Sequence, residues 1–300
     1  MAEAERAAAP AREGEGRAVL ATMRPRQWAK NLLLFAGILF AAQYDDPGRW
    51  IEAFVAFVAY CAASSAAYIV NDVLDAEEDR RHPLKRNRPI AAGVLAPDRA
   101  LKIAAMLAIF AVAAMSWFGW ASVAYVTGFL ALQGAYSWRL KQVVLIDVMA
   151  IAALFVIRAA AGAEAVDVRI SPWLIVCTAL LALFLALAKR RGELTALGEH
   201  GSGGVRSVLA GYSFPLVDQL VSIVAACTIV AYSLYTFEAR EGSAMMATIP
   251  FVVFGIFRYL LLMHREDLGE EPESVLLSDV PILLTIALWA LTSALILGFS

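Results

Sequence analysis

Long apolar runs, separated by short polar segments, dominate the chain. A helix that crosses a bilayer needs about 20 mainly apolar residues, and nine segments approach or exceed that length. They are residues 31–44, 50–70, 101–118, 120–136, 144–163, 172–188, 217–238, 247–263 and 281–298. The pattern therefore predicts an all-α, polytopic membrane protein, a bundle of about nine transmembrane helices.

The composition agrees with a membrane class. Of the 300 residues, 61% are hydrophobic and 17% charged, and the mean hydropathy of +0.67 exceeds that of ordinary soluble domains. Residues 1–22 are rich in Ala, Arg and Glu and lack the apolar core of a secretory signal. We expect this segment to be a disordered cytoplasmic tail, followed by one membrane domain over residues 23–300.

The basic residues predict how the chain is oriented. In the nine-span arrangement, 21 of the 25 Lys and Arg residues fall in the N-terminal segment and in alternate loops. The other side holds only Arg49, Arg169 and Arg240, and Arg158 lies within a span. By the positive-inside rule the N-terminus and the long polar loops face the cytoplasm. We therefore expect a multi-pass protein of the cytoplasmic membrane whose active face is inside.

A row of carboxylates stands at the inner end of the second span. Asp72, Asp75 and Asp79 are spaced by three and then four residues, which places them on one face of a continuing helix. Such a row favours a hard divalent cation, and Mg²⁺ typically takes one or two carboxylates together with phosphate oxygens and water. The alternative is a solvated helix end paired with Arg80 and Arg81. The membrane boundary and the basic loop that follows favour a metal and phosphate site.

The loop after the carboxylates carries candidate anion ligands. Lys85 and Arg88 lie in a segment that Pro83 and Pro89 restrain. Both are suited to phosphate, and an arginine can bind it through two parallel hydrogen bonds. For His82 we expect a role in shaping the loop ahead of acid/base chemistry.

Three further polar residues are candidates from their positions. Arg158 lies within a span, where a charge costs about 2.5–3.5 kcal/mol on insertion scales, so it should face a polar cavity or pair with a neighbouring carboxylate such as Asp147. Tyr136 and Lys141 flank an inner loop. They could bind substrate. Alternatively, Tyr136 could be an aromatic residue at the membrane interface and Lys141 a basic residue that sets the membrane topology.

Together, the carboxylates and the loop read Asn71-Asp72-x-x-Asp75-x-x-x-Asp79-x-x-His82-Pro83-x-Lys85-x-x-Arg88-Pro89. This stretch resembles the first aspartate motif of the UbiA superfamily of intramembrane prenyltransferases. The resemblance extends over nearly the whole chain. It implies a helical bundle around a central cavity that opens to the cytoplasmic face, with an Mg²⁺-diphosphate site at its mouth.

The second aspartate-rich motif of that superfamily is replaced here by Lys189-Arg190-Arg191-Gly192-Glu193. Cations at this position would neutralise phosphate directly, which suits a phosphorylated sugar substrate. Further segments are similar to one branch, the decaprenyl-phosphate phosphoribosyltransferases. They are residues 24–31, 136–141, Asp147 with Arg158 to Gly162, 189–193, and Arg258-Tyr259 with residues 269–273.

This resemblance implies transfer of 5-phosphoribose from phosphoribosyl diphosphate (PRPP) to a polyprenyl phosphate, for lipid-linked pentose supply in cell-wall synthesis. Asp72, Asp75 and Asp79 would hold Mg²⁺, with Lys85 and Arg88 assisting on the diphosphate or the nucleophile. Lys189 and Arg190 would anchor a phosphate, and Glu193 would accept a ribose hydroxyl. The full set of expected substrate-binding residues is Lys30, Asn31, Asn71, Tyr136, Lys141, Arg158, Lys189, Arg190 and Glu193.

The expected partners are the polyprenyl phosphate, PRPP and the bilayer, with no nucleic acid; a homo-oligomer is compatible with the sequence. Two other functions stay open. One is an ordinary prenyltransferase that moves a polyprenyl chain from its diphosphate to an aromatic or tetrapyrrole acceptor, which fits the first motif and not the second. The other is a transporter of an anionic lipid or solute, for which no pair of broken, symmetry-related spans gives support.

Overall fold

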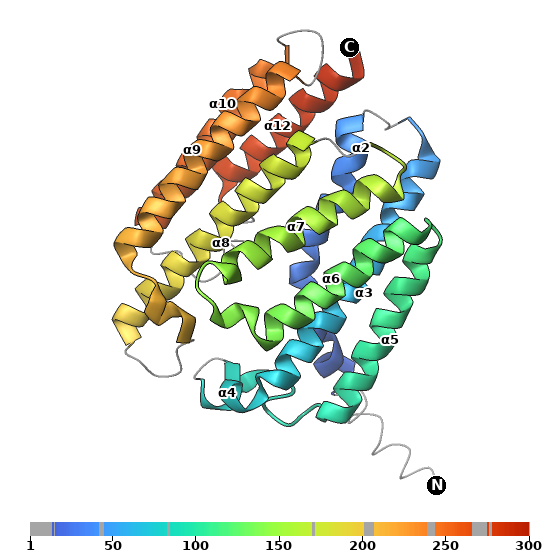
Figure 1. Cartoon of the computed structure of the whole chain (residues 1–300), viewed down its shortest axis with the longest axis vertical. Helices are drawn as coiled ribbons and strands as arrows, with labels where there is room; N and C mark the ends of the chain where they lie inside the picture. The colour runs from blue at the N-terminus through green and yellow to red at the C-terminus, as the bar shows by residue number, and fades with distance from the viewer. Residues whose placement is uncertain are drawn as a thin grey trace.

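The computed structural model describes residues 14, 16–41, 45–82, 85–169, 172–200, 207–238, 244–265, 275 and 278–299. Within these ranges the chain forms helices and short turns and contains no strand, which confirms the predicted all-α class. The long helices run side by side in one bundle (Figure 1). In chain order the elements are η1 (Pro25–Phe35), α2 (Ala36–Ala41), α3 (Pro47–Leu74), α4 (Ala76–Arg81), η2 (Lys85–Asn87), α5 (Pro97–Ser116), α6 (Trp120–Trp138), η3 (Leu140–Gln142), α7 (Ile146–Ala165), α8 (Pro172–His200), η4 (Ser207–Gly211), α9 (Phe214–Glu238), η5 (Ala244–Thr248), α10 (Ile249–Arg265) and α12 (Val280–Phe299).

Among the described residues, six helical segments are long and apolar enough to cross a membrane. They are Pro47–Leu74, Pro97–Ser116, Ile146–Ala165, Phe214–Glu238, Ala244–Arg265 and Val280–Gly298. The membrane class is thus supported, whereas the predicted count of nine spans is not confirmed. Of the other three predicted spans, 120–136 coincides with α6 and 172–188 lies within α8. The described part of the third, residues 31–41, is divided between η1 and the short α2, and residues 42–44 lie outside the described residues.

Local chemistry explains where α3 begins. The Asp46 carboxylate accepts a hydrogen bond from the Gly48 N–H at 2.8 Å, and Pro47 occupies the first helical position of α3.

Trp117 and Trp120 flank the turn between α5 and α6 and are 84% and 85% exposed. Trp side chains are typical of the membrane-water interface, so we expect this turn to lie near a membrane surface.

Small residues allow the helices of the first half to approach closely. Ala56, Ala59 and Ala63 of α3 are fully buried, and α3 packs against α5 and α6. Close contact through small side chains is the usual way that helices associate in lipid, where apolar surface alone gives no driving force. On α7, Gly162 lies against the backbone of Leu34 in η1. The element η1 is therefore held tightly against α7.

The predicted disorder of residues 1–22 is wrong for its last part. Residues 16–23 are helical, and Val19 and Met23 pack against an apolar cluster that includes Ile69, Ile90 and Leu95. Burial of these two apolar side chains offsets the entropy cost of ordering the segment. Residues 1–13 and 15 lie outside the described residues.

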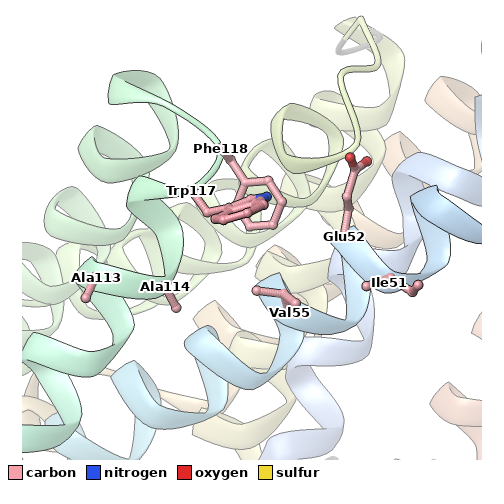
Figure 2. A pocket seen from close by; sticks show the side chains of 7 residues that line it. All are labelled: Ile51, Glu52, Val55, Ala113, Ala114, Trp117 and Phe118. Atoms are coloured by element: carbon pink, nitrogen blue, oxygen red, sulfur yellow. The ribbon is translucent and has the colours of Figure 1, made fainter.

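An apolar groove lies between the start of α3 and the end of α5 (Figure 2). It is lined by Ile51, Glu52, Val55, Ala113, Ala114, Trp117 and Phe118. Glu52 is its one charged lining residue, and Arg49 donates to that carboxylate at 3.1 Å. The groove sits at the end of α3 remote from Asp72, so it does not correspond to the cavity that the sequence predicts at the cytoplasmic face. That predicted cavity is not confirmed.

The contact between Gly162 and Leu34 gives a test of this packing. A Cβ atom at position 162 would lie 2.2 Å from the Leu34 carbonyl oxygen, so we expect Gly162→Ala to destabilise the protein by about 1–3 kcal/mol. Gly128→Ala is the matched control, since a Cβ there meets nothing within 4 Å and improves helix propensity. Thermal unfolding in detergent measures both. Equal midpoints for the two variants would contradict the close contact.

Candidate active site

Most of the predicted site residues lie at one end of the bundle, where α3 runs into α4 and where η2, η3 and the last turns of α8 also lie (Figure 1). The C-terminal helix α12 ends at the opposite end of the bundle. We call Asp72, Asp75 and Asp79 the acidic cluster. Asp72 and Asp79 are 2% and 3% exposed, so their carboxylates are buried among protein groups.

The expected continuing helix is broken at Asp75, between α3 and α4. The backbone of Asp75 has φ −91° and ψ 2°, yet its N–H donates to the Asn71 carbonyl at 2.9 Å. The Asp79 N–H donates in turn to the Asp75 carbonyl at 2.8 Å. Because helical hydrogen bonds continue across the break, the acidic cluster stays on one side while Asp75 is turned toward different partners.

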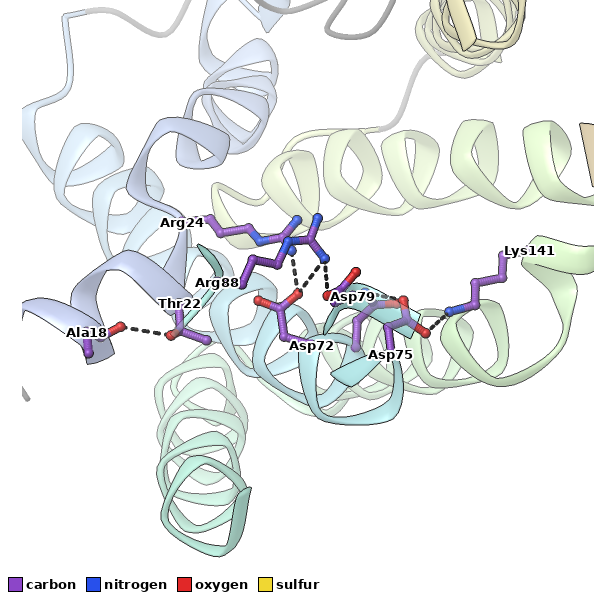
Figure 3. Close-up of polar contacts among 9 residues, drawn as sticks. Ala18, Thr22, Arg24, Asp72, Asp75, Asp79, Arg88 and Lys141 are labelled. Carbon is purple, nitrogen blue, oxygen red and sulfur yellow. Dashed lines mark hydrogen bonds and ion pairs between the residues drawn. The ribbon is translucent and has the colours of Figure 1, made fainter. Parts of the chain in front are cut away.

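Two arginines neutralise Asp72 and Asp79 (Figure 3). Nη1 of Arg88 lies 2.7 Å from Oδ2 of Asp79 and 3.3 Å from Oδ1 of Asp72. Arg24 donates to the same oxygen of Asp72, and its guanidinium lies 5.1 Å from the ring centroid of Tyr68. Arg24 was absent from the predicted site. Its positive φ of 54° at the start of η1 turns the chain there, a feature that local sequence does not reveal.

Asp75 has a separate pair of partners. Lys141 from η3 forms an ion pair with its Oδ1 (Figure 3). The side-chain amide of Asn71 donates to Oδ2 at 3.0 Å. Lys141 is only 8% exposed, so the pair is largely removed from water. The fold therefore brings together Asn71, Lys141 and the acidic cluster, which are all residues that the sequence predicts at the site.

An Mg²⁺ site in the acidic cluster requires carboxylate oxygens that point toward one position. Among the described residues, no three His, Cys, Asp or Glu side chains are grouped to hold a metal ion, because Asp75 is drawn toward Lys141. Oδ1 of Asp72 and Oδ2 of Asp79, however, surround one positively charged nitrogen of Arg88. Two carboxylates that share one cationic centre fit the usual protein contribution to an Mg²⁺-phosphate site.

A second charged group involves the basic stretch of α8. Arg190 is 0% exposed; its Nε lies 2.8 Å from Oδ2 of Asp147 in α7, and its Nη1 contacts Glu193. Tyr212, after η4, donates to Oδ1 of Asp147 at 2.6 Å. Burial, and then this hydrogen bond, raise the pKa of Tyr212 well above its usual value, so the hydroxyl stays a donor. We call Asp147, Arg190, Glu193 and Tyr212 the Arg190 cluster.

Arg158 does not pair with Asp147. Both residues lie on α7, eleven positions apart and so about 16 Å along the helix axis. Instead, Nε of Arg158 donates to the side-chain oxygen of Asn31 at 2.8 Å, and the guanidinium lies 4.7 Å and 5.3 Å from the ring centroids of Phe129 and Phe155. The two predicted substrate residues Asn31 and Arg158 are therefore in contact, inside the bundle.

The remaining predicted residues are half-buried on separate elements. Lys30 belongs to η1, Lys85 to η2 and Lys189 to α8, and Tyr136 of α6 is close enough to Arg190 to interact with its charge. The nitrogen Nδ1 of His82 accepts a hydrogen bond from the Lys85 N–H at 3.3 Å, which agrees with the expected role in shaping the loop. The substrate roles of these lysines and of Tyr136 stay predictions.

Comparisons with known proteins agree on one family. The UbiA prenyltransferase family matches residues 32–280. A protein named decaprenyl-phosphate phosphoribosyltransferase from Mycolicibacterium smegmatis is 34% identical, over 94% of this chain and 93% of its own length, and one of the same name from Mycobacterium tuberculosis is 33% identical over 94% of each. A UbiA homolog from Archaeoglobus fulgidus, solved bound to GPP and Mg²⁺, shares the fold with a TM-score of 0.71 at 16% identity, over 94% of this chain and all of the other.

The two neighbouring arginines of α8 give a test of the buried pair. Asp147→Asn would leave Arg190 short of a carboxylate in a site where both side chains are 0% exposed, so we expect a loss of about 3–5 kcal/mol. Asp218→Asn is the matched control, because Asp218 pairs with Arg191 at 2.7 Å but is 40% exposed, which should limit the loss to about 1 kcal/mol. Thermal unfolding in detergent compares the two. A larger loss for Asp218→Asn would contradict the assigned burial.

Proposed function

Because the chain belongs to the UbiA prenyltransferase family, we propose that it transfers 5-phosphoribose from PRPP to a polyprenyl phosphate, of the decaprenyl type, and releases diphosphate. The observation that carries this proposal is the match of nearly the entire chain to relatives named decaprenyl-phosphate phosphoribosyltransferase. The basic Lys189–Glu193 stretch, where a prenyl-diphosphate enzyme has a second acidic motif, agrees with a phosphorylated sugar as substrate.

In the proposed reaction an oxygen of the lipid phosphate forms a bond to the anomeric carbon of ribose, while the bond from that carbon to diphosphate breaks. The nucleophile is already an anion, so no general base is required. The difficult step is departure of diphosphate as positive charge develops on the sugar. Groups that stabilise the leaving diphosphate therefore contribute most to the rate.

Asp72 and Asp79 would hold Mg²⁺, with Asp75 as the third expected ligand. When bound, Mg²⁺ supplies charge neutralisation at the leaving diphosphate. The A. fulgidus homolog, which has the same fold, was solved with Mg²⁺ and GPP, which supports metal use in the family. Arg88 forms ion pairs with two of these carboxylates, so it would reach a diphosphate bound beside them.

Other polar residues around this end would bind the anionic parts of the substrates. We assign Lys85 to the diphosphate or the lipid phosphate, and Lys189 to the 5-phosphate or the lipid phosphate. Glu193 would accept a hydrogen bond from a ribose hydroxyl. The expected substrate roles of Lys30, Asn31, Asn71, Tyr136, Lys141 and Arg158 belong to the same proposal.

We also propose the finer topology on the strength of the charge pattern. The chain would cross the cytoplasmic membrane nine times, with α6, α8 and the η1–α2 segment added to the six long apolar segments. The basic loops would then place the N-terminus and the active site on the cytoplasmic side, at the mouth of a central cavity. The product would supply pentose for cell-wall synthesis, and a homo-oligomer is compatible with this arrangement.

A direct assay tests the function. Purified protein in detergent, given Mg²⁺ and decaprenyl phosphate, should convert radiolabelled PRPP into a lipid-extractable phosphoribosyl product. A parallel reaction with GPP and an aromatic acid should give no product. Product in the second reaction alone would refute the proposal and support the ordinary prenyltransferase function.

The acidic cluster gives the matching mutational test. Asp72→Asn, Asp75→Asn and Asp79→Asn should each lower kcat about 100-fold or more at saturating Mg²⁺, since each removes charge from the diphosphate site. Glu77→Gln and Glu78→Gln are the matched controls, because both side chains are exposed on the neighbouring helix α4. They should retain near wild-type rates. Near-normal kcat for all three asparagine variants would end the metal-site assignment.

A further inference from the structure

We infer that Arg190 is a positioning residue that holds the Glu193 carboxylate toward the ribose of PRPP, and that it is not a phosphate anchor. This inference rests on the proposed function and revises the phosphate-binding role that the sequence predicts for Arg190. Asp147 forms an ion pair with Arg190, and Tyr212 donates a hydrogen bond to Asp147. Lys189 and Glu193 are then the residues of the basic stretch that meet substrate.

The burial of Arg190 is the first argument. Its side chain is 0% exposed, and carboxylates of Asp147 and Glu193 contact two different nitrogens of its guanidinium. A phosphate on Arg190 would lie beside two negative charges, which disfavours it. Nε and Nη1 therefore each face a carboxylate, while Nη2 is a buried donor that has no hydrogen-bond partner among the described residues.

The second argument is that Arg190 is itself held in place from the α7 side. Asp147 lies in the first turn of α7, where the helix dipole favours an acidic side chain. The Tyr212 hydroxyl donates to Asp147 and accepts from the Leu145 N–H at 2.8 Å. Leu145 has a positive φ of 67°, a strained conformation that surrounding contacts must maintain. Such strain, held by a buried hydrogen-bonded side chain, is typical of functional sites.

Glu193 is the third argument, because it differs from the other acidic member of the cluster in exposure. Its side chain is 17% exposed, whereas those of Arg190 and Asp147 are 0% exposed. Glu193 can therefore contact a ligand while the ion pair with Arg190 fixes its side-chain rotamer. A carboxylate is an acceptor only, so the ligand group that it fits is a hydroxyl donor such as those of ribose.

The neighbouring Arg191 provides a contrast on the same helix. Its Nε donates to Asp218 at 2.7 Å and its Nη1 to the carbonyl of Met263 at 2.9 Å, so it links α8 to α9 and α10. Adjacent side chains on a helix point about 100° apart, which separates these two arginines. Arg191→Gln is accordingly the control for loss of a positive charge from α8.

The test is a double-mutant cycle on purified enzyme, with KM measured separately for PRPP and for decaprenyl phosphate. We expect Glu193→Gln and Arg190→Gln each to raise the KM for PRPP by about 10–100-fold, the value of one charge-assisted hydrogen bond. The KM for decaprenyl phosphate should change less than about threefold in both. The double variant should be no worse than either single variant, because both remove the same contact. Arg191→Gln should leave both KM values near wild type.

Further variants keep the test decisive where Arg190→Gln fails to fold. Arg190→Lys keeps the charge but cannot span two carboxylates, and should raise the KM for PRPP as Arg190→Gln does. Tyr212→Phe removes only one hydroxyl and should raise it a few-fold. Multiplicative effects in the cycle, or an Arg190 variant that raises the KM for decaprenyl phosphate, would overturn the inference while transfer from PRPP still stands. A wild-type protein that forms no product from PRPP would refute the proposed function and this inference together.

Discussion

The cost of burying charge at the edge of a membrane bundle is the constraint on which the rest of this structure depends. A buried ion without a partner is strongly destabilising, so each must find an opposite charge or a polar group. Here the partners come from distant parts of the chain: Arg24 pairs with Asp72, Lys141 with Asp75 and Arg190 with Asp147. Each pair joins segments that are far apart in the sequence, so the contacts that assemble the candidate site also hold the bundle together.

Apolar runs and charge spacing predict much of this arrangement. The segment 120–136 closely matches α6, and Asp72 and Asp79 share one arginine, Arg88, although the expected continuing helix breaks at Asp75. The segment 31–44 shows the limit, because its described part, residues 31–41, is divided between η1 and α2 and is not one continuous helix. Close packing of Leu34 on Gly162 and the bond from Arg158 to Asn31 act on this region from α7. Such tertiary contacts override local apolar pattern and are not encoded in it.

The basic stretch of α8 shows why residue types alone do not assign a role. A run of Lys and Arg at an inner helix end predicts phosphate binding equally well for each member, yet consecutive side chains leave the helix in different directions. Arg190 turns inward to Asp147, and Arg191 turns to Asp218. Which direction each takes depends on how α7 and α9 pack against α8. Tyr212 gave no signal in the sequence, because it acts only through the fold that brings it to Asp147.

The acidic cluster combines these constraints at one place. Three carboxylates on one side of a helix end repel one another, and without compensation they would destabilise the junction of α3 and α4. Arg24, Arg88 and Lys141 supply that compensation from three separate segments, and so fix the positions of η1, the loop after α4 and η3 relative to α3. The cations that balance the carboxylates are the same groups that could contact a bound phosphate. A substitution in the cluster therefore changes both the local fold and the charge offered to a ligand, and folding must be measured beside activity to separate the two effects.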